Sequence, residues 1–187
     1  MSAYRMVLGV DPSTHTGWSL QAQSKDGLKC DEKTGEINFP GKQAGFVRSM
    51  YLAGEVSALV SNYHPDLVVF EGYAFGAQHN NYLQVEVGTL MRERMYTSGT
   101  PYITVTPGSL KKFATGSGGA KKEQVMLQVF KRWGFEAKTN NEADAYVLAR
   151  IGLAYLDPLA VGLTKSQAEV IAVLRKATIA VLRKEKP

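Results

Sequence analysis

The most constraining feature of this sequence is the apolar run Met6–Val10, which ends directly in Asp11. A short run of this kind is typical of a strand that is covered on both faces of a sheet. A carboxylate at the end of such a strand must face a cleft, a cation or a helix end, because burying an unpaired charge is costly. The segment Pro12–Trp18 that follows has the composition of a turn. The sequence therefore predicts a buried strand that delivers Asp11 to its carboxyl end, where a hairpin begins.

Two further acids occupy comparable positions. Glu71 ends the apolar run Leu67–Phe70, and Asp144 lies near the start of a predicted helix rich in small residues. Mg²⁺ prefers oxygen ligands and usually keeps several waters, so three or four side chains suffice to bind it. Two such ions about 3.5–4 Å apart can activate water and stabilise the leaving oxygen in phosphodiester hydrolysis. The three acids thus indicate a divalent-metal nuclease, with Asp11 expected to bridge two ions and the other two acids to flank it.

Composition limits the remaining possibilities. The 187 residues are 44% hydrophobic and suffice for one sizeable core. Cys30 is the single cysteine, which excludes an intrachain disulfide and a cysteine-rich zinc site. No apolar run approaches the ~20 residues of a membrane span, and the first residues lack the pattern of a secretory signal. We therefore expect a cytoplasmic protein.

The net charge of +5 is unevenly distributed along the chain. Residues 1–75 have a net charge of −2, whereas residues 76–187 have a net charge of +7. A run of basic residues in the second half has only Glu123 as a nearby acid: Lys111, Lys112, Lys121, Lys122, Lys131 and Arg132. Such a run is usually a solvated helix face. Close to a metal site, and next to the glycines of 116–119, it favours contact with a nucleic-acid backbone.

The hydrophobic periodicity predicts a mixed α/β fold with a five-stranded sheet flanked by helices. Strands are expected at 4–11, 16–22, 28–39, 67–71 and 102–106. Helices are expected at 42–63, 81–96, 109–114, 121–133, 141–153 and 163–184. The early hairpins make the sheet partly antiparallel, and the later strands return through helical crossovers. We expect one domain over residues 1–157 and a C-terminal helical extension over 158–187.

With its acids in this order, the chain resembles the RuvC family of Holliday junction resolvases, which has the ribonuclease H-like fold. The matching segments are Gly9–Pro12 with Thr16–Trp18, Glu71, the stretch from Lys111 to Lys122, and Glu142–Ala145, within a match of about residues 4–155. The most specific of these is the pair of lysines, which stand eleven positions apart across a glycine-rich loop. In the family this pattern contacts the DNA backbone near the scissile phosphate.

The resemblance implies a crossover junction endodeoxyribonuclease that acts in DNA recombination and repair and nicks four-way junctions symmetrically. It implies two Mg²⁺ ions per site, with Mn²⁺ able to substitute, and catalytic roles for Asp11, Glu71, Asp144 and Lys122. It also implies a homodimer, for which the interface is expected on the helix after the 73–81 loop, through Leu83, Val85, Val87, Leu90 and Met91. The expected DNA contacts are Tyr73, Phe75, Lys111, Lys112, Lys121 and Lys122, the two aromatic residues by stacking on a base.

The sequence departs from the family pattern at Asn141. The family commonly has Asp or His three residues before its last Asp, and a neutral amide is a weaker ligand than a carboxylate. We favour Asn141 over Glu142 as the fourth metal ligand, since positions 141 and 144 share a helix face. Asn141 also suits the N-cap of the helix, and both roles are compatible.

Two other functions remain open at this point. A related ribonuclease H-like nuclease could act on flaps or on RNA–DNA hybrids, since a fold does not determine a substrate. A noncatalytic junction-binding protein could have kept the fold and lost the metal, which the neutral Asn141 favours.

Overall fold

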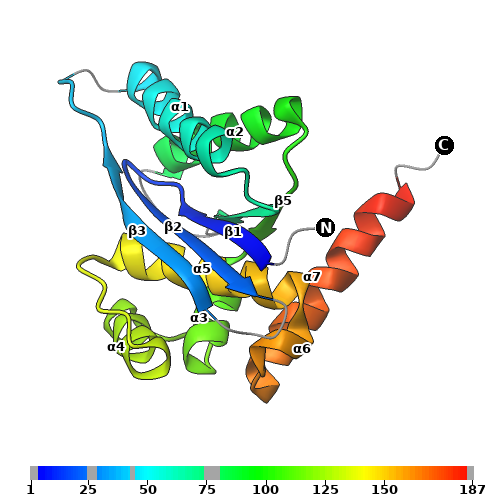
Figure 1. The fold of residues 1–187 in the computed structure, drawn as a ribbon. Coiled ribbons are helices and arrows are strands. Elements are labelled where there is room, and N and C mark those ends of the chain that lie inside the picture. The colour runs from blue at the N-terminus through cyan, green and yellow to red at the C-terminus, as the bar shows by residue number, and fades with distance from the viewer. Residues whose placement is uncertain (1–3, 25–28, 43–44, 74–80, 185–187) are drawn as a thin grey trace.

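The computed structural model describes residues 4–24, 29–42, 45–73 and 81–184. Their strands form one five-stranded sheet with the order β3-β2-β1-β4-β5 (Figure 1). The strands are β1 (Tyr4–Asp11), β2 (His15–Ser24), β3 (Lys29–Asn38), β4 (Leu67–Glu71) and β5 (Tyr102–Val105). β1, β2 and β3 are antiparallel neighbours, whereas β4 and β5 run parallel to β1. The predicted mixed sheet is confirmed.

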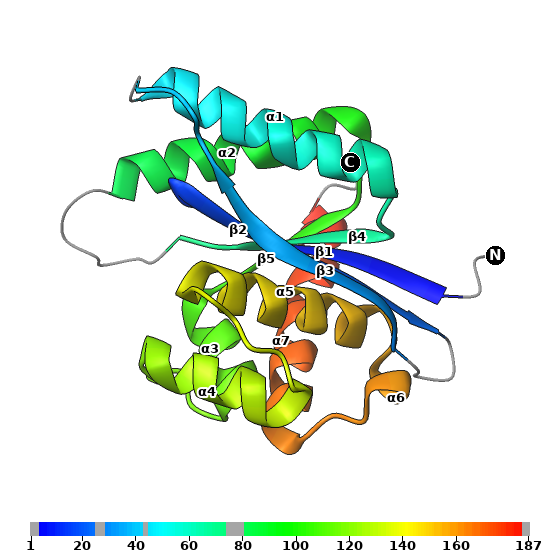
Figure 2. The same ribbon diagram turned by 60° about the vertical axis from the view of Figure 1, so that its left-hand side comes forward.

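Helices cover both faces of the sheet (Figure 2). One face carries α1 (Phe46–Tyr63) and α2 (Asn81–Ser98), and the other carries α5 (Asn140–Leu156). Outside α5 lie α3 (Pro107–Thr115), α4 (Lys122–Trp133) and α7 (Lys165–Lys184). The short α6 (Pro158–Val161) was not predicted. None of the helices in the described ranges is long and apolar enough to cross a membrane.

The alternation of side chains along the strands determines which face each strand-end acid occupies. Val7 and Val69 pack into the core beneath α5, whereas Val10 and Phe70 pack into the core beneath α1 and α2. Because successive side chains point to opposite faces, an acid that follows Val10 or Phe70 lies on the α5 face. Val10 is also the register partner of Phe70 on the parallel strand β4. Asp11 and Glu71 therefore end adjacent strands on the same face of the sheet.

Three glycines allow α5 to lie directly against the sheet. A Cβ on Gly9 would stand 2.2 Å from the backbone oxygen of Ala145, and a Cβ on Gly152 would stand 2.4 Å from Cγ1 of Val7. At the start of α5, a Cβ on Gly17 would stand 2.2 Å from a backbone oxygen of the helix. A glycine inside a strand often marks such a close approach of another backbone. This contact brings the first turn of α5 onto the ends of β1 and β2.

The first half of α7 packs against the rest of the protein. Val170 and Ile171 are buried in the core beneath α5, and Gln167 donates a hydrogen bond to the backbone oxygen of Phe113. Lys112 on α3 forms an ion pair of 2.8 Å with Glu169 on α7. The division of the chain at residue 157 stays a prediction.

Candidate active site

Three carboxylates meet at the carboxyl ends of β1 and β4. Asp11 and Glu71 come from those strand ends, and Asp144 comes from the second turn of α5. Each offers an oxygen atom, and the three oxygens lie within 4.8 Å of one another. Asp11 is buried, with 5% of its surface exposed, and the other two are half-buried. The three acids that the sequence singled out are thus brought together by sheet register and by the seating of α5.

The three carboxylates line a hollow of about 700 Å³. The turn after β1 contributes Ser13 and Thr14 to its wall, and α2 contributes Leu83 and Gln84. Lys111, Lys122 and Asn141 complete the polar lining. The hollow therefore places acids and lysines around the same space, as the uneven charge distribution along the sequence suggested.

Burial and mutual repulsion make the three acids poor anions in the absence of a cation. Burial raises the pKa of Asp11 to about 6, although a hydrogen bond from Glu71 and the charge of Lys122 oppose the rise. Burial, followed by the charges of the other two acids, raises the pKa of Glu71 to about 9. Burial and the charge of Asp11 raise the pKa of Asp144 to about 7. The raised pKa of Glu71 therefore favours its protonated form, which donates a hydrogen bond to Asp11.

Of the four lysines predicted to contact DNA, two face the carboxylates. Lys122, the first residue of α4, lowers the pKa of all three acids through its charge, and Lys111 does so for Asp144. Lys121 is exposed at the N-cap of α4. Lys112 lies on the α7 side, in its ion pair with Glu169. The structure thus groups Lys111 and Lys122 with the acids and places Lys112 elsewhere.

The first turn of α5 corrects one prediction and leaves another standing. The N-cap is Thr139, whose side chain accepts a hydrogen bond from the backbone N–H of Glu142, so the N-cap prediction for Asn141 was wrong. Glu142 is buried and accepts a hydrogen bond of 2.8 Å from the backbone N–H of Lys138. Glu142 therefore stabilises the start of α5. Asn141 lines the hollow, and its role as a metal ligand stays a prediction.

Glu36 on β3 is a residue that the sequence reasoning missed. Its Oε1 accepts hydrogen bonds from Thr139 Oγ1 at 2.6 Å and from Asn141 Nδ2 at 3.0 Å. Its charge also contributes to the raised pKa of Asp11. No signal in the neighbouring sequence marks Glu36; its position follows from the hairpin register, in which Glu36 lies opposite Gly17 and Gly17 lies opposite Asp11.

The aromatic residues after Glu71 are only partly described. The hydroxyl of Tyr73 donates to the backbone oxygen of Val85 at 3.2 Å and shares a hydrogen bond of 2.8 Å with Thr89. The guanidinium of Arg92 bonds to the same hydroxyl and lies 4.7 Å from the ring centroid. Tyr73 is therefore tied to α2. Phe75 lies outside the described residues.

The predicted interface on α2 needs a correction. Val87 and Met91 are at most 1% exposed and belong to the core beneath α1 and α2, so they cannot contact a second copy. Val85 is exposed, as is the neighbouring Tyr82. The apolar face of α2 packs against the sheet and α1, and only the tertiary structure shows which of its side chains are exposed to solvent.

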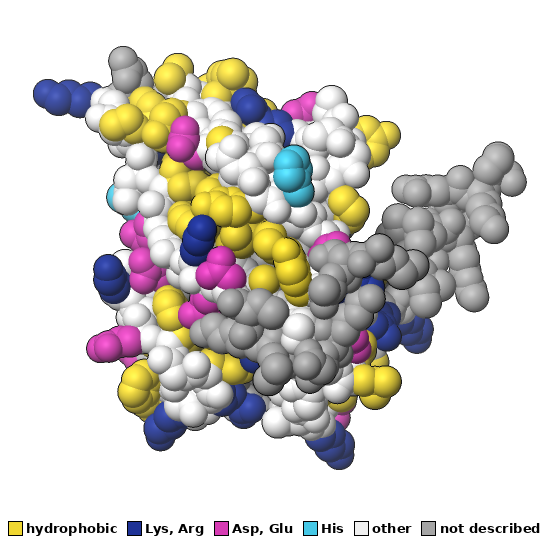
Figure 3. Space-filling view, viewed as in Figure 1, with side chains coloured by type: hydrophobic (Ala, Val, Ile, Leu, Met, Phe, Trp, Pro, Cys, Tyr) yellow, Lys and Arg dark blue, Asp and Glu magenta, His cyan; other side chains and the backbone are white. Residues whose placement is uncertain are grey.

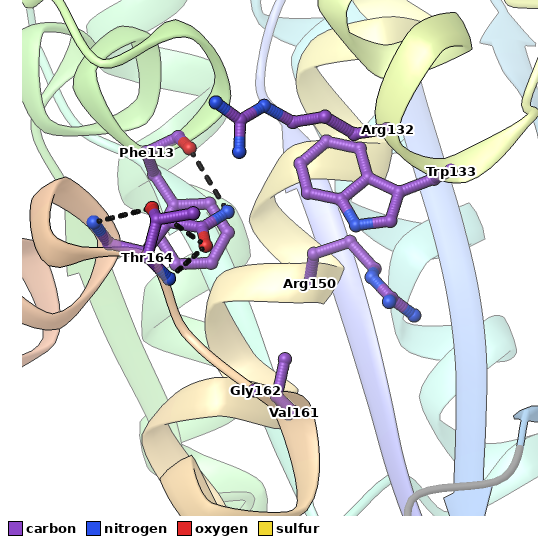
Figure 4. Close-up of a pocket in the computed structure, with 8 residues that line it drawn as sticks. Phe113, Arg132, Trp133, Arg150, Val161, Gly162 and Thr164 are labelled. Atoms are coloured by element: carbon purple, nitrogen blue, oxygen red, sulfur yellow. Dashed lines mark hydrogen bonds between the residues drawn. The ribbon is translucent and has the colours of Figure 1, made fainter.

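A second hollow, of about 250 Å³, lies where α3, α4 and α5 meet the turn into α7 (Figure 4). Trp133 lies between Arg132 and Arg150, and the guanidinium of Arg150 is 5.6 Å from the Trp133 ring centroid. None of the three clustered carboxylates lines this space. Among the described residues, the cluster of three carboxylates therefore belongs to the larger hollow and not to this one.

Comparisons with known proteins agree with this geometry. The family model described as crossover junction endodeoxyribonuclease RuvC matches residues 7–151. A relative from Chlorobium phaeovibrioides with that name is 31% identical, over 66% of this chain and 67% of its own. A relative from Syntrophomonas wolfei with the same name is 30% identical, over 76% of this chain and 85% of its own.

Solved structures show the same fold. The Thermus thermophilus RuvC structure aligns with a TM-score of 0.65 and 22% identity, over 79% of this chain and 97% of that one. The structure of T. thermophilus RuvC in complex with a Holliday junction substrate aligns with a TM-score of 0.63 and 22% identity, over 84% of this chain and 96% of that one.

Proposed function

Because this chain belongs to the RuvC family of crossover junction endodeoxyribonucleases, we propose that it resolves four-way DNA junctions with Asp11, Glu71 and Asp144 as its metal-binding carboxylates. The family model spans more than three quarters of the chain, and the carboxylates lie within the matched residues. The chain is therefore an endonuclease that acts on branched DNA. The observation that carries the residue assignment is the convergence of three carboxylate oxygens within 4.8 Å.

The residues of the hollow fit a divalent cation. A cation among three acids this close together would lower their raised pKa values and allow all three to ionise together at neutral pH. The donors are all oxygen atoms, which suits Mg²⁺ and Mn²⁺ and disfavours softer metals. We assign two ions to the site. When bound, they would polarise the phosphate and lower the pKa of a water that attacks it.

The protein's own groups have distinct roles in this scheme. Asp11 is the most buried of the three acids and comes from the central strand of the sheet, so it is the residue that would bridge two ions. Glu71 and Asp144 would each hold one side. Lys122 and Lys111 enter the same hollow from α4 and α3 and would hold the phosphate backbone against the metals.

We also propose that the protein acts as a homodimer, since symmetric nicking requires two active sites. Exposed apolar side chains lie near the starts of α1 and α2, and the Ser49–Glu86 hydrogen bond joins these two helices. Figure 3 shows hydrophobic side chains gathered over the start of α1. The exposed side chains near these helix starts, which replace the buried part of the predicted interface, are Phe46, Val47, Met50, Tyr82 and Val85.

Cleavage of a synthetic four-way junction tests the proposed function. Linear duplex, a flap and an RNA–DNA hybrid serve as the other substrates, each with Mg²⁺, with Mn²⁺ and with chelator. The expected result is paired nicking of the junction alone, which stops in chelator. Equal cleavage of the flap or the hybrid would reject junction selectivity, and full activity in chelator would reject the metal site.

A further inference from the structure

Glu36, a carboxylate outside the cluster of three acids, and the backbone oxygen of His15 together hold the side chain of Asn141. The Nδ2 atom of Asn141 carries two protons, and it donates to the backbone oxygen of His15 at 2.8 Å and to Oε1 of Glu36 at 3.0 Å. Both partners are acceptors only. A flipped amide would place its oxygen against two other oxygens, so the network allows one orientation of the side chain.

The sheet explains how Glu36 reaches this position. Asp11, Gly17 and Glu36 are successive register partners across β1, β2 and β3, and the side chains of Asp11 and Glu36 lie on the α5 face. Because Gly17 has no side chain, the backbone of Asn141 lies directly over it. Glu36 and Asp11 therefore flank the start of α5 on its two sides.

Glu36 also holds the end of the helix that carries Asp144. Oε1 of Glu36 accepts a hydrogen bond from the hydroxyl group of Thr139. The oxygen of that hydroxyl group also caps α5, because it accepts a hydrogen bond from the backbone N–H of Glu142. A carboxylate at a helix N-terminus is favoured by the helix dipole. The hydrogen bonds that Oε1 of Glu36 accepts from Thr139 and Asn141 thus attach the first turn of α5 to β3.

We propose that Glu36 is a positioning residue of the metal site, which engages the amide nitrogen of Asn141 so that the amide oxygen faces the three carboxylates as a fourth, neutral donor. The inference rests on the proposed metal site and adds a residue to it. Glu36 lies outside the group of described acids whose oxygens converge within 4.8 Å, so it acts through Asn141. The arrangement adds an oxygen ligand without adding a further charge to the crowded cluster.

Mn²⁺ binding to the metal-free full chain, measured by calorimetry without DNA, tests this role. Partners that orient a metal ligand typically contribute ~10–100-fold to affinity. We expect Glu36→Ala to weaken Mn²⁺ binding about tenfold, and Glu36→Gln to retain nearly all of it, because a single oxygen of Glu36 accepts both bonds. Asp31→Ala is the matched control: it removes an exposed acid of the same strand and should leave binding unchanged.

A double-mutant cycle separates positioning from direct ligation. In an Asn141→Ala background, Glu36→Ala should weaken Mn²⁺ binding by only the small part that runs through Thr139 and the start of α5, because its main effect passes through the missing amide. A full tenfold loss in that background, or equal losses in Glu36→Gln and Glu36→Ala, would overturn the proposal. If Glu36→Ala does not fold, Glu36→Asp takes its place, since it shortens the side chain by one methylene group. A protein that shows the expected Mn²⁺ pattern but cuts no junction would reject the proposed function and leave this inference standing.

Discussion

Asp11→Asn is expected to stabilise the metal-free protein while abolishing cleavage. Asp11 is buried with a pKa of about 6 in the folded state, against 3.8 as its ordinary value. Because the folded pKa is the higher one, the folded state binds this proton more tightly. The associated stability is fully present below about pH 4 and is lost as the pH rises through 6. An asparagine cannot ionise and escapes this loss.

The size of the effect follows from the pKa difference. A shift of about two units at ~1.36 kcal/mol per unit corresponds to about 3 kcal/mol at pH 8. For a chain of this length, that is a rise in melting temperature of roughly 6–12 °C. The charge of Asp11 also raises the pKa of Glu71. Removing that charge lowers the cost of ionising Glu71 in the folded state, which stabilises the variant further. The difference between variant and wild type should shrink to near zero at about pH 4.

Thermal melts in chelator between pH 4 and 8.5 measure this difference, with the exposed Asp31→Asn as the control that should change nothing. Added Mg²⁺ should stabilise the wild type and hardly affect Asp11→Asn, because only a ligand bound by the folded state stabilises it. Junction binding should persist, since the phosphate contacts lie elsewhere. A variant that is less stable than wild type in chelator at pH 8, or one that cleaves at a near wild-type rate in Mg²⁺, would refute the reasoning.

Three more substitutions test other parts of the structure. Gly9→Ala should lower the free energy of unfolding, measured in urea, by about 1–3 kcal/mol, because the added Cβ would stand 2.2 Å from a backbone oxygen of α5. Gly108→Ala is the control and should not lower it, because a Cβ added there would meet no atom within 4 Å. Asn141→Asp should melt lower in chelator, because it places a second carboxylate against Glu36, and should gain more from Mg²⁺ than wild type does; equal gains would remove residue 141 from the metal site. Lys122→Ala should slow cleavage and reduce the log–log salt slope of junction binding by about 0.9, and an unchanged slope with unchanged cleavage would return this lysine to the solvated surface.

The strands, the long helices and the three acids could be predicted from the sequence because their signals are local. An apolar run that ends in Asp11 or Glu71 records both the strand and its end. Strand alternation places both acids on one face only once the register of β1 with β4 and the packing of Val10 and Phe70 are known. The two lysines on either side of the glycine-rich loop indicated the family, and the family match over residues 7–151 confirms it.

Other features were decided only by tertiary contacts. The sequence predicted that Val87 and Met91 contact a second copy of the chain, but the sheet and α1 cover them. An apolar stripe on a helix has the same sequence pattern whether it packs within one chain or between two chains. Thr139, rather than Asn141, caps α5, a shift of two residues that helix-end signals in sequence do not resolve.

The role of Glu36 shows the same division most clearly. It lies 105 residues from Asn141 in the chain, and nothing in its own neighbourhood marks it as different from the other acids of β3. Its contact requires the hairpin register, the missing side chain at Gly17 and the seating of α5, all at once. The sequence by itself determined which residues could supply the chemistry, because residue type and strand position are local properties. The tertiary structure decided how those residues are held, because a hydrogen bond between distant segments exists only after the chain has folded.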